Sequence, residues 1–227
     1  RKDYKDRSKF KKGFARIYTW NGSGWNQVGS NILGTQKKEY AGTSVAISED
    51  GSRVAIGSWA FDSSGNDRGR VRVYDNVGGT WKLKFNIFGE KKKDFASSVS
   101  LSDDGNILAL GAAQNDGGGN NSGHARVYDI SGSSKKQLGD DINGETGGQE
   151  LGATVSLSSN GQRLAVGAPK ANSESGRATI FDYDSSSDSW TKVGSYIKGV
   201  ATSNGCDGSG YGTILIAHVI LRERLLH

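Results

Sequence analysis

Three segments of this sequence recur at a nearly constant spacing, and this repeat constrains the fold more than any other feature. The first segment occurs at residues 44–57, 98–111 and 154–167, with offsets of 54 and 56 residues. The second occurs at residues 13–18, 69–74, 123–128 and 176–181, and the third at residues 25–32, 81–87, 135–142 and 190–197. A repeat of this length is typical of proteins that stack their units in a row or in a ring.

Each unit is predicted to contain four short antiparallel strands. Apolar residues alternate at Val45 and Ile47, which is the period of a strand. The Asp50-Gly51 pair follows, and such a pair tolerates positive φ at both central positions of a two-residue hairpin loop. Residues 54–56 are a continuous apolar run, as expected for a strand buried on both faces. The other two segments supply two more strands, and four antiparallel strands per unit predict a propeller blade.

The sequence therefore predicts an all-β fold, a β-propeller built from four-stranded antiparallel blades. Glycine accounts for 34 of the 227 residues, and each costs a helix interior about 1 kcal/mol, which disfavours a helical fold. A β-solenoid is the alternative, but its turns are usually shorter and lack hairpin signals. We expect a basic arm at residues 1–12, propeller repeats over 13–221 and a tail at 222–227. Within the repeats we expect a half blade at 13–33, complete blades at 44–89, 98–143 and 154–199, and a partial blade at 210–221.

Two arrangements of these blades remain open. In the first, residues 211–221 pair with residues 14–32 and the termini share a fourth blade, which closes the ring and protects its edges. In the second, the chain is an incomplete arc of a larger propeller. Residues 214–226 depart from the repeat pattern, so they form either a strand or a short helix that docks elsewhere.

The third unit carries a resemblance to a known family. Residues 151–155, 164–169 and 176–181 read Leu-Gly-Ala-Thr-Val, Leu-Ala-Val-Gly-Ala-Pro and Gly-Arg-Ala-Thr-Ile-Phe. This order resembles the FG-GAP repeat of integrin α-subunit-type propellers and their microbial and algal relatives. The resemblance implies an adhesion-type propeller, often with a calcium loop between the first two strands. Here that loop is reduced to pairs such as Asp50-Gly51, which cannot encircle a calcium ion, so we expect no metal and no cofactor.

The charge of the chain is concentrated at its start. The net charge is +5, and residues 1–12 alone sum to +5, so the remaining chain is neutral and lacks the basic face of a nucleic-acid-binding domain. The arm is either a docking element for an acidic partner or an anionic membrane surface, or a solvated tail. The longest apolar run, residues 214–221, is too short to span a membrane. Cys206 is the single cysteine, so no internal disulfide and no cysteine metal cluster are expected. Two Asn-x-Ser sequons begin at Asn21 and Asn120, which suits a secreted or organelle-lumenal protein.

The sequence offers no recognisable catalytic constellation. The three histidines, His124, His218 and His227, lie in a repeat strand, an apolar run and the terminus. None of them accompanies a motif Ser, Cys or carboxylate in the way that nucleophilic catalysis requires. His124 stands where the other units have Arg70 and Arg177, so we expect it on a strand surface. We therefore expect the chain not to be an enzyme.

Binding is the favoured function, and two basic segments are its candidates. Lys37, Lys38 and Tyr40 precede the first complete unit, and Lys91, Lys92 and Lys93 precede the second. Equivalent repeat positions place both clusters on one face, in adjacent blades, and the third unit has Gly147 and Gly148 there instead. Such a patch suits an anionic glycan or an acidic protein, although exposed lysines also serve solubility.

Trp59 is a further candidate binding residue. It occupies the loop position where the third unit has Pro169, and an aromatic side chain there suits contact with a sugar ring or a protein partner. We accordingly expect an interaction module of the adhesion or extracellular type. The alternative is a structural accessory subunit of a large assembly, anchored by the basic arm and the C-terminal segment.

Overall fold

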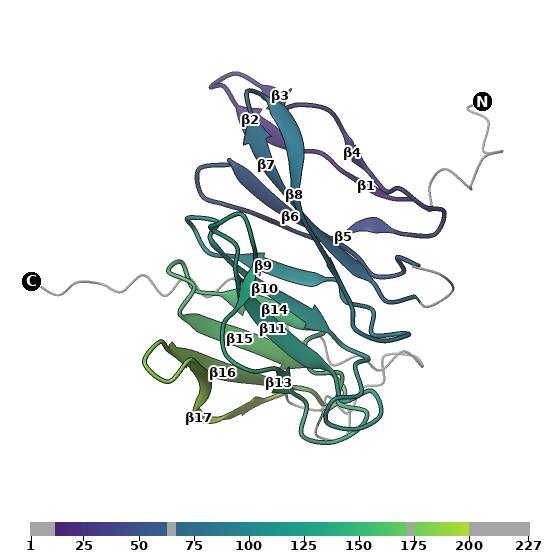
Figure 1. The fold of residues 1–227 in the computed structure, drawn as a ribbon, viewed down its shortest axis with the longest axis vertical. Helices are drawn as coiled ribbons and strands as arrows, with labels where there is room; N and C mark the ends of the chain where they lie inside the picture. Colours follow the sequence, from purple (N-terminus) through teal and green to yellow (C-terminus); the bar gives the residue numbers. More distant parts are fainter. Residues whose placement is uncertain (1–11, 63–66, 172–174, 200–227) are drawn as a thin grey trace, which may run out of the picture.

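The computed structural model describes residues 12–62, 67–171 and 175–199, and all the regular structure within them is β-strand (Figure 1). Three successive sheets follow the repeat. Sheet I contains β5 (Ala41–Ile47), β6 (Arg53–Ser58), β7 (Arg70–Val77) and β8 (Thr80–Phe88). Sheet II contains β9 (Ser98–Leu101), β10 (Ile107–Ala112), β11 (His124–Asp129), β12 (Lys136–Gln137) and β13 (Ile142–Asn143). Sheet III contains β14 (Thr154–Leu157), β15 (Arg163–Ala168), β16 (Arg177–Asp184) and β17 (Ser189–Lys198).

Each sheet is an antiparallel meander, which confirms the all-β fold and the four-stranded antiparallel sheets. In sheet II the outer strand is split into β12 and β13, and both pieces pair with β11. Before sheet I lies a half sheet of two short pairs, β1 (Phe14–Ala15) with β4 (Ile32–Leu33) and β2 (Tyr18–Trp20) with β3 (Trp25–Gln27). The sheets stack face to face as in a propeller.

The described residues form an open array. The half sheet and β17 lie at opposite ends of the molecule (Figure 1), and no strand pairing joins them within residues 12–199 as far as these are described. The arm at residues 1–11, the partial blade expected at 210–221 and the tail at 222–227 lie outside the described residues. No helix long and apolar enough to cross a membrane occurs in the part that the structure describes.

The hairpin between the first two strands of each sheet differs from the predicted two-residue loop. Only the glycine has a positive φ, +70° at Gly51, whereas two positive values were expected. Asp50 instead accepts hydrogen bonds from Ser48 Oγ at 2.7 Å and from the Ser52 N–H at 2.9 Å. These two bonds lower the pKa of Asp50 to about 2. The carboxylate thus closes a longer Asx-type turn, which removes the need for a second left-handed residue.

The sheets are joined by apolar layers and by hydrogen bonds between their inner strands. One layer between sheets I and II includes Val73 and Leu110, and a second between sheets II and III includes Val127 and Val166. The Val99 N–H donates to Ser44 Oγ and the Val155 N–H to Ser98 Oγ, both at 3.1 Å. Because both apolar packing and hydrogen bonds join sheet I to sheet II and sheet II to sheet III, the array is a rigid support for the loops at its rim.

Candidate binding surface

The connectors that precede sheets I and II have the same unusual backbone. In the β4–β5 connector, Lys38 and Tyr40 have φ values of 63° and 54°, and in the β8–β9 connector Lys93 and Phe95 have 65° and 52°. These values lie in the left-handed region, which non-glycine residues seldom adopt. In each connector the two strained residues flank an acidic residue, Glu39 or Asp94.

The acidic residue between them is turned inward and buried, which explains the conformation. Glu39 accepts hydrogen bonds from the Gln36 N–H at 3.0 Å and from Arg70, whose side chain is also buried. Burial raises the pKa of Glu39, but the hydrogen bonds from Arg70 and Gln36 and the charges of Arg70 and Arg72 outweigh this effect, so the pKa is lowered. Asp94 accepts a hydrogen bond from the Lys91 N–H at 2.6 Å. The anchored carboxylates leave the neighbouring lysines on the outside.

An aromatic cluster joins the two connectors. Trp59, directly after β6, stacks on Tyr40 with ring centroids 5.3 Å apart and an interplanar angle of 23°. Its ring also lies 5.2 Å from the ring of Phe95, at an angle of 48°. These separations are typical of favourable aromatic pairs. Trp59 is 37% exposed, so the central ring of the cluster remains accessible to a ligand.

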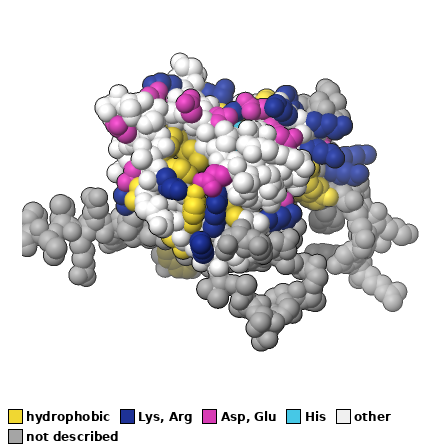
Figure 2. Space-filling view, turned by 90° about the horizontal axis from the view of Figure 1, so that it is seen from below, with side chains coloured by type: hydrophobic (Ala, Val, Ile, Leu, Met, Phe, Trp, Pro, Cys, Tyr) yellow, Lys and Arg dark blue, Asp and Glu magenta, His cyan; other side chains and the backbone are white. Residues whose placement is uncertain are grey.

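Five exposed lysines lie on the two connectors that carry Tyr40 and Phe95. We call the following residues the lysine–aromatic patch: Lys37, Lys38, Tyr40, Trp59, Lys91, Lys92, Lys93 and Phe95. None of the five lysines forms an ion pair with another residue that the structure describes. Both connectors lie on the right-hand side of Figure 1, and Lys and Arg side chains gather at the right-hand edge of the molecule in Figure 2. Within the described ranges, the patch therefore combines lysines that form no ion pair with three aromatic rings.

The patch as defined consists of the seven residues predicted from the sequence as binding candidates, together with Phe95. Trp59 is distant in sequence from both lysine clusters, and its ring lies against Tyr40 of one connector and Phe95 of the other. Phe95 and the two buried carboxylates, Glu39 and Asp94, were not predicted from the sequence. The equivalent positions Tyr40 and Phe95, both aromatic and both preceded by an acid, were the available signal.

The third connector has different chemistry. Gln149 takes the place of the buried acid and accepts a hydrogen bond from Arg177 at 3.0 Å. Glu150 pairs with Lys170 at 2.7 Å where the other two connectors have an aromatic residue. The lysines of the first two connectors thus have no counterpart in the third, which has Gly147 and Gly148 at those positions.

His124 is buried, and the expectation that it lies on a strand surface is wrong. Its side chain is 2% exposed. A ring nitrogen of His124 and carboxylate oxygens of Glu90, in the β8–β9 connector, and Asp141, between β12 and β13, all lie within 4.8 Å of one another. Burial and the charge of Arg126 lower the pKa of His124. The Arg126 guanidinium forms ion pairs with Glu90 and with Asp141, and its Nη2 lies 2.5 Å from Glu90 Oε1. Since a cation of the chain already fills the position between them, this cluster is a structural ion-pair network.

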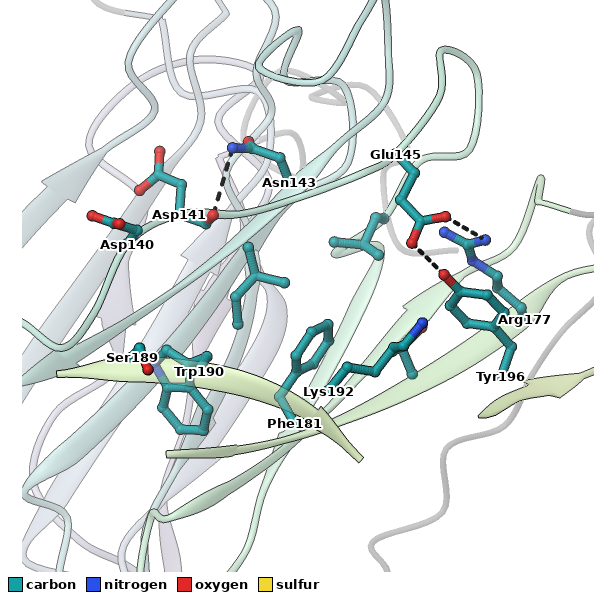
Figure 3. Close-up of a pocket in the computed structure, with 13 residues that line it drawn as sticks. Asp140, Asp141, Asn143, Glu145, Arg177, Phe181, Ser189, Trp190, Lys192 and Tyr196 are labelled. Carbon is teal, nitrogen blue, oxygen red and sulfur yellow. Dashed lines mark hydrogen bonds and ion pairs between the residues drawn. The ribbon is translucent and has the colours of Figure 1, made fainter. Parts of the chain in front are cut away.

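A cavity of about 390 Å³ lies between the β13–β14 connector and sheet III (Figure 3). Thr179 lines it, at the strand position that Arg126 occupies in sheet II, so the smaller side chain leaves space there. Glu145 accepts a hydrogen bond from Tyr196 and pairs with Arg177 at 3.3 Å, whereas the buried Thr179 hydroxyl has no hydrogen-bond partner among the described residues. Asp140 and Lys192 also line the cavity, and the Lys192 ammonium lies 4.1 Å from the centre of the Tyr196 ring.

No protein-family model and no curated protein sequence matches the chain. Among solved structures, TolB from Acinetobacter baumannii matches with 17% identity and a TM-score of 0.46, over 79% of this chain and 37% of that chain. A Bacteroides uniformis protein named provisionally as a 6-phosphogluconolactonase matches with 9% identity and a TM-score of 0.57, over 82% and 49% of the two chains. A Bacteroides fragilis protein with the same provisional name matches with 13% identity and a TM-score of 0.52, over 75% and 44%.

These matches support a propeller-like fold, and they do not single out the FG-GAP repeat. The chain covers less than half the length of each of the three structures. The two with TM-scores above 0.5 share the arrangement of successive antiparallel sheets.

The prediction that the chain is not an enzyme is contradicted by these comparisons. Two structures that share its fold carry the provisional name of an enzyme, 6-phosphogluconolactonase. The prediction rested on a search for local motifs, whereas sites on repeat folds are assembled from residues of separate units, which such a search does not find. At 9% and 13% identity the likeness shows the fold alone, and it assigns no reaction to this chain.

Proposed function

We propose that the chain is an interaction module of the adhesion or extracellular type, and that the lysine–aromatic patch binds an anionic glycan such as a sulfated oligosaccharide. The observation that carries this proposal is the position of Trp59, which packs against Tyr40 and Phe95 and remains 37% exposed between two lysine-bearing connectors. The FG-GAP resemblance of the repeats belongs to the same proposal, because it implies an adhesion-type propeller.

The chemistry of the patch suits such a ligand in two ways. An indole ring offers an apolar face to a sugar ring, and unpaired lysines offer charge-assisted hydrogen bonds to sulfate or carboxylate groups. The buried carboxylates of Glu39 and Asp94 hold the connectors in one conformation. A surface that is already ordered loses less conformational entropy when it binds.

Replacing Lys91, Lys92 and Lys93 by alanine is expected to weaken binding of a heparin-derived oligosaccharide about tenfold. Each exposed ion pair contributes about 0.2–1 kcal/mol, and a total of about 1.4 kcal/mol corresponds to a factor of ten. Isothermal titration calorimetry at a fixed salt concentration measures the change.

The matched control replaces Lys82, Lys135 and Lys136, which are also exposed, and so changes the net charge by the same amount. We expect this variant to bind within twofold of the unaltered chain. Equal losses in the two triple variants, or no binding of the oligosaccharide at all, would contradict the proposal. A poly-glutamate peptide that binds more tightly than the glycan would identify the partner as an acidic protein.

A further inference from the structure

Two apolar residues of β5 are exposed at positions that are buried in the other two sheets. Val45 is 60% exposed and Ile47 is 50% exposed. The equivalent residues are between 3% and 8% exposed, namely Val99 and Leu101 in β9 and Val155 and Leu157 in β14. The local sequence is alike in all three strands, so the difference comes from what lies over the strand.

Val45 and Ile47 are exposed because the described half sheet, which precedes sheet I, has only outer strands and no inner strands to pack over β5. Sheet I covers the apolar face of β9, and sheet II covers that of β14. In the described residues, β1 and β2 pair only with β4 and β3. The strands that correspond to β5 and β6 of a complete unit are therefore absent from the half sheet as described.

Where these inner strands are absent, an apolar groove lies between the half sheet and sheet I. It has a volume of about 220 Å³ and is lined by Ala15, Ile17, Val45, Ile47 and Ile56 among others. β1 belongs to the same repeat segment as β7 of sheet I. β7 pairs with both β6 and β8, whereas β1 has one described partner strand, β4. The groove thus combines an apolar floor with a free strand edge, and this combination accepts an added β-strand.

The sequence contains one segment that suits this groove. Residues 210–213, Gly-Tyr-Gly-Thr, match the start of a unit, and residues 214–221 are the longest apolar run in the chain. Seven of these eight residues are apolar and the eighth is His218, and a run of this kind is typical of a strand buried on both faces. We propose that residues 214–221 of a second copy of this chain fill the groove as an inner strand, in a mutual exchange that makes a twofold dimer.

The order of the sheets favours a second copy over the same chain. β5 lies beside β9 and β9 beside β14, so successive units stack in one direction, away from the groove. β17 lies at the end of the molecule opposite the half sheet (Figure 1). Residues 199–213 connect β17 to the proposed strand in sequence, whereas the groove of the same chain lies at the other end of the array.

Cross-linking between two marked chains tests the exchange. In a Cys206→Ser background, one tagged chain carries Val45→Cys and an untagged chain carries Leu215→Cys, and the two are co-expressed and treated with a short bis-maleimide. The expected product has the mass of two chains and contains one of each. A third chain carries both cysteines, and a link within that single chain would overturn the proposal, as would the absence of any product.

Light scattering on the purified full chain gives an independent readout. We expect the mass of a dimer at micromolar concentration, and the mass of a monomer after Val45→Asp with Ile47→Asp. The control is Val77→Asp, because Val77 is also 50% exposed but lies at the β7–β8 hairpin; this variant should remain dimeric. A monomeric unaltered chain would overturn the proposal. These outcomes are independent of glycan binding, since the groove shares no residue with the lysine–aromatic patch.

Discussion

Replacing Glu39 by alanine is expected to lower the free energy of unfolding by about 3–5 kcal/mol, the cost of removing one partner of a buried ion pair. Glu39 is fully buried, and its carboxylate pairs with Arg70 and lies 3.5 Å from Arg72. Both arginine side chains are buried as well. Without the carboxylate, two guanidinium groups remain in the interior and no buried acid neutralises them.

Urea unfolding followed by circular dichroism measures this loss. The matched control is Asp182→Ala, which breaks the ion pair with Arg163, where both side chains are 43% exposed. An exposed pair contributes about 0–1 kcal/mol, so the control should be only slightly less stable than the unaltered chain. Similar losses in the two variants would contradict the structural role assigned to Glu39.

Replacing Gly111 by alanine is expected to cost about 3 kcal/mol or more, or to prevent folding. A Cβ atom at this position would lie 1.9 Å from the carbonyl oxygen of Gly152 in the connector to sheet III. Gly57 has the same relation to the carbonyl oxygen of Ser97. Because the obstacle is backbone, no side chain can rotate to relieve the clash, and the two sheets must separate.

Thermal unfolding compares this variant with Gly24→Ala. A Cβ atom at Gly24 would meet nothing within 4 Å, so a surface change of this kind should alter stability by less than about 0.5 kcal/mol. If Gly111→Ala were as stable as Gly24→Ala, the close approach of the sheets would be disproved.

The fold was largely predictable because its signals are local. The alternation at Val45 and Ile47 and the apolar run at residues 54–56 predict the first two strands of a unit, and repetition predicts the others. The hairpin was predicted with the wrong geometry, because the hydrogen bonds that Asp50 accepts are not apparent from the Asp-Gly pair alone. The exposure of Val45 was also unpredictable, since it depends on the strands that cover it.

The candidate site was predictable only in part. The repeat places the two lysine clusters in equivalent connectors, and the structure has them there. The contact of Trp59 with Tyr40 and Phe95 joins residues from three separate loops, which no local pattern encodes. Lys-Lys-Glu-Tyr suggests a solvated charged segment, yet Glu39 is buried because Arg70, far away in the sequence, supplies its countercharge.

The central claim is that an anionic glycan binds on the aromatic cluster between the two lysine-bearing connectors. Tryptophan fluorescence tests this directly: the chain and its Trp59→Phe variant are titrated with a heparin-derived oligosaccharide. The chain has five tryptophans, and only Trp59 lies in the patch. We predict an emission change in the unaltered chain that is absent from the variant, while calorimetry shows that the variant still binds. An emission change of equal size in both proteins, or none at saturation, would contradict the claim.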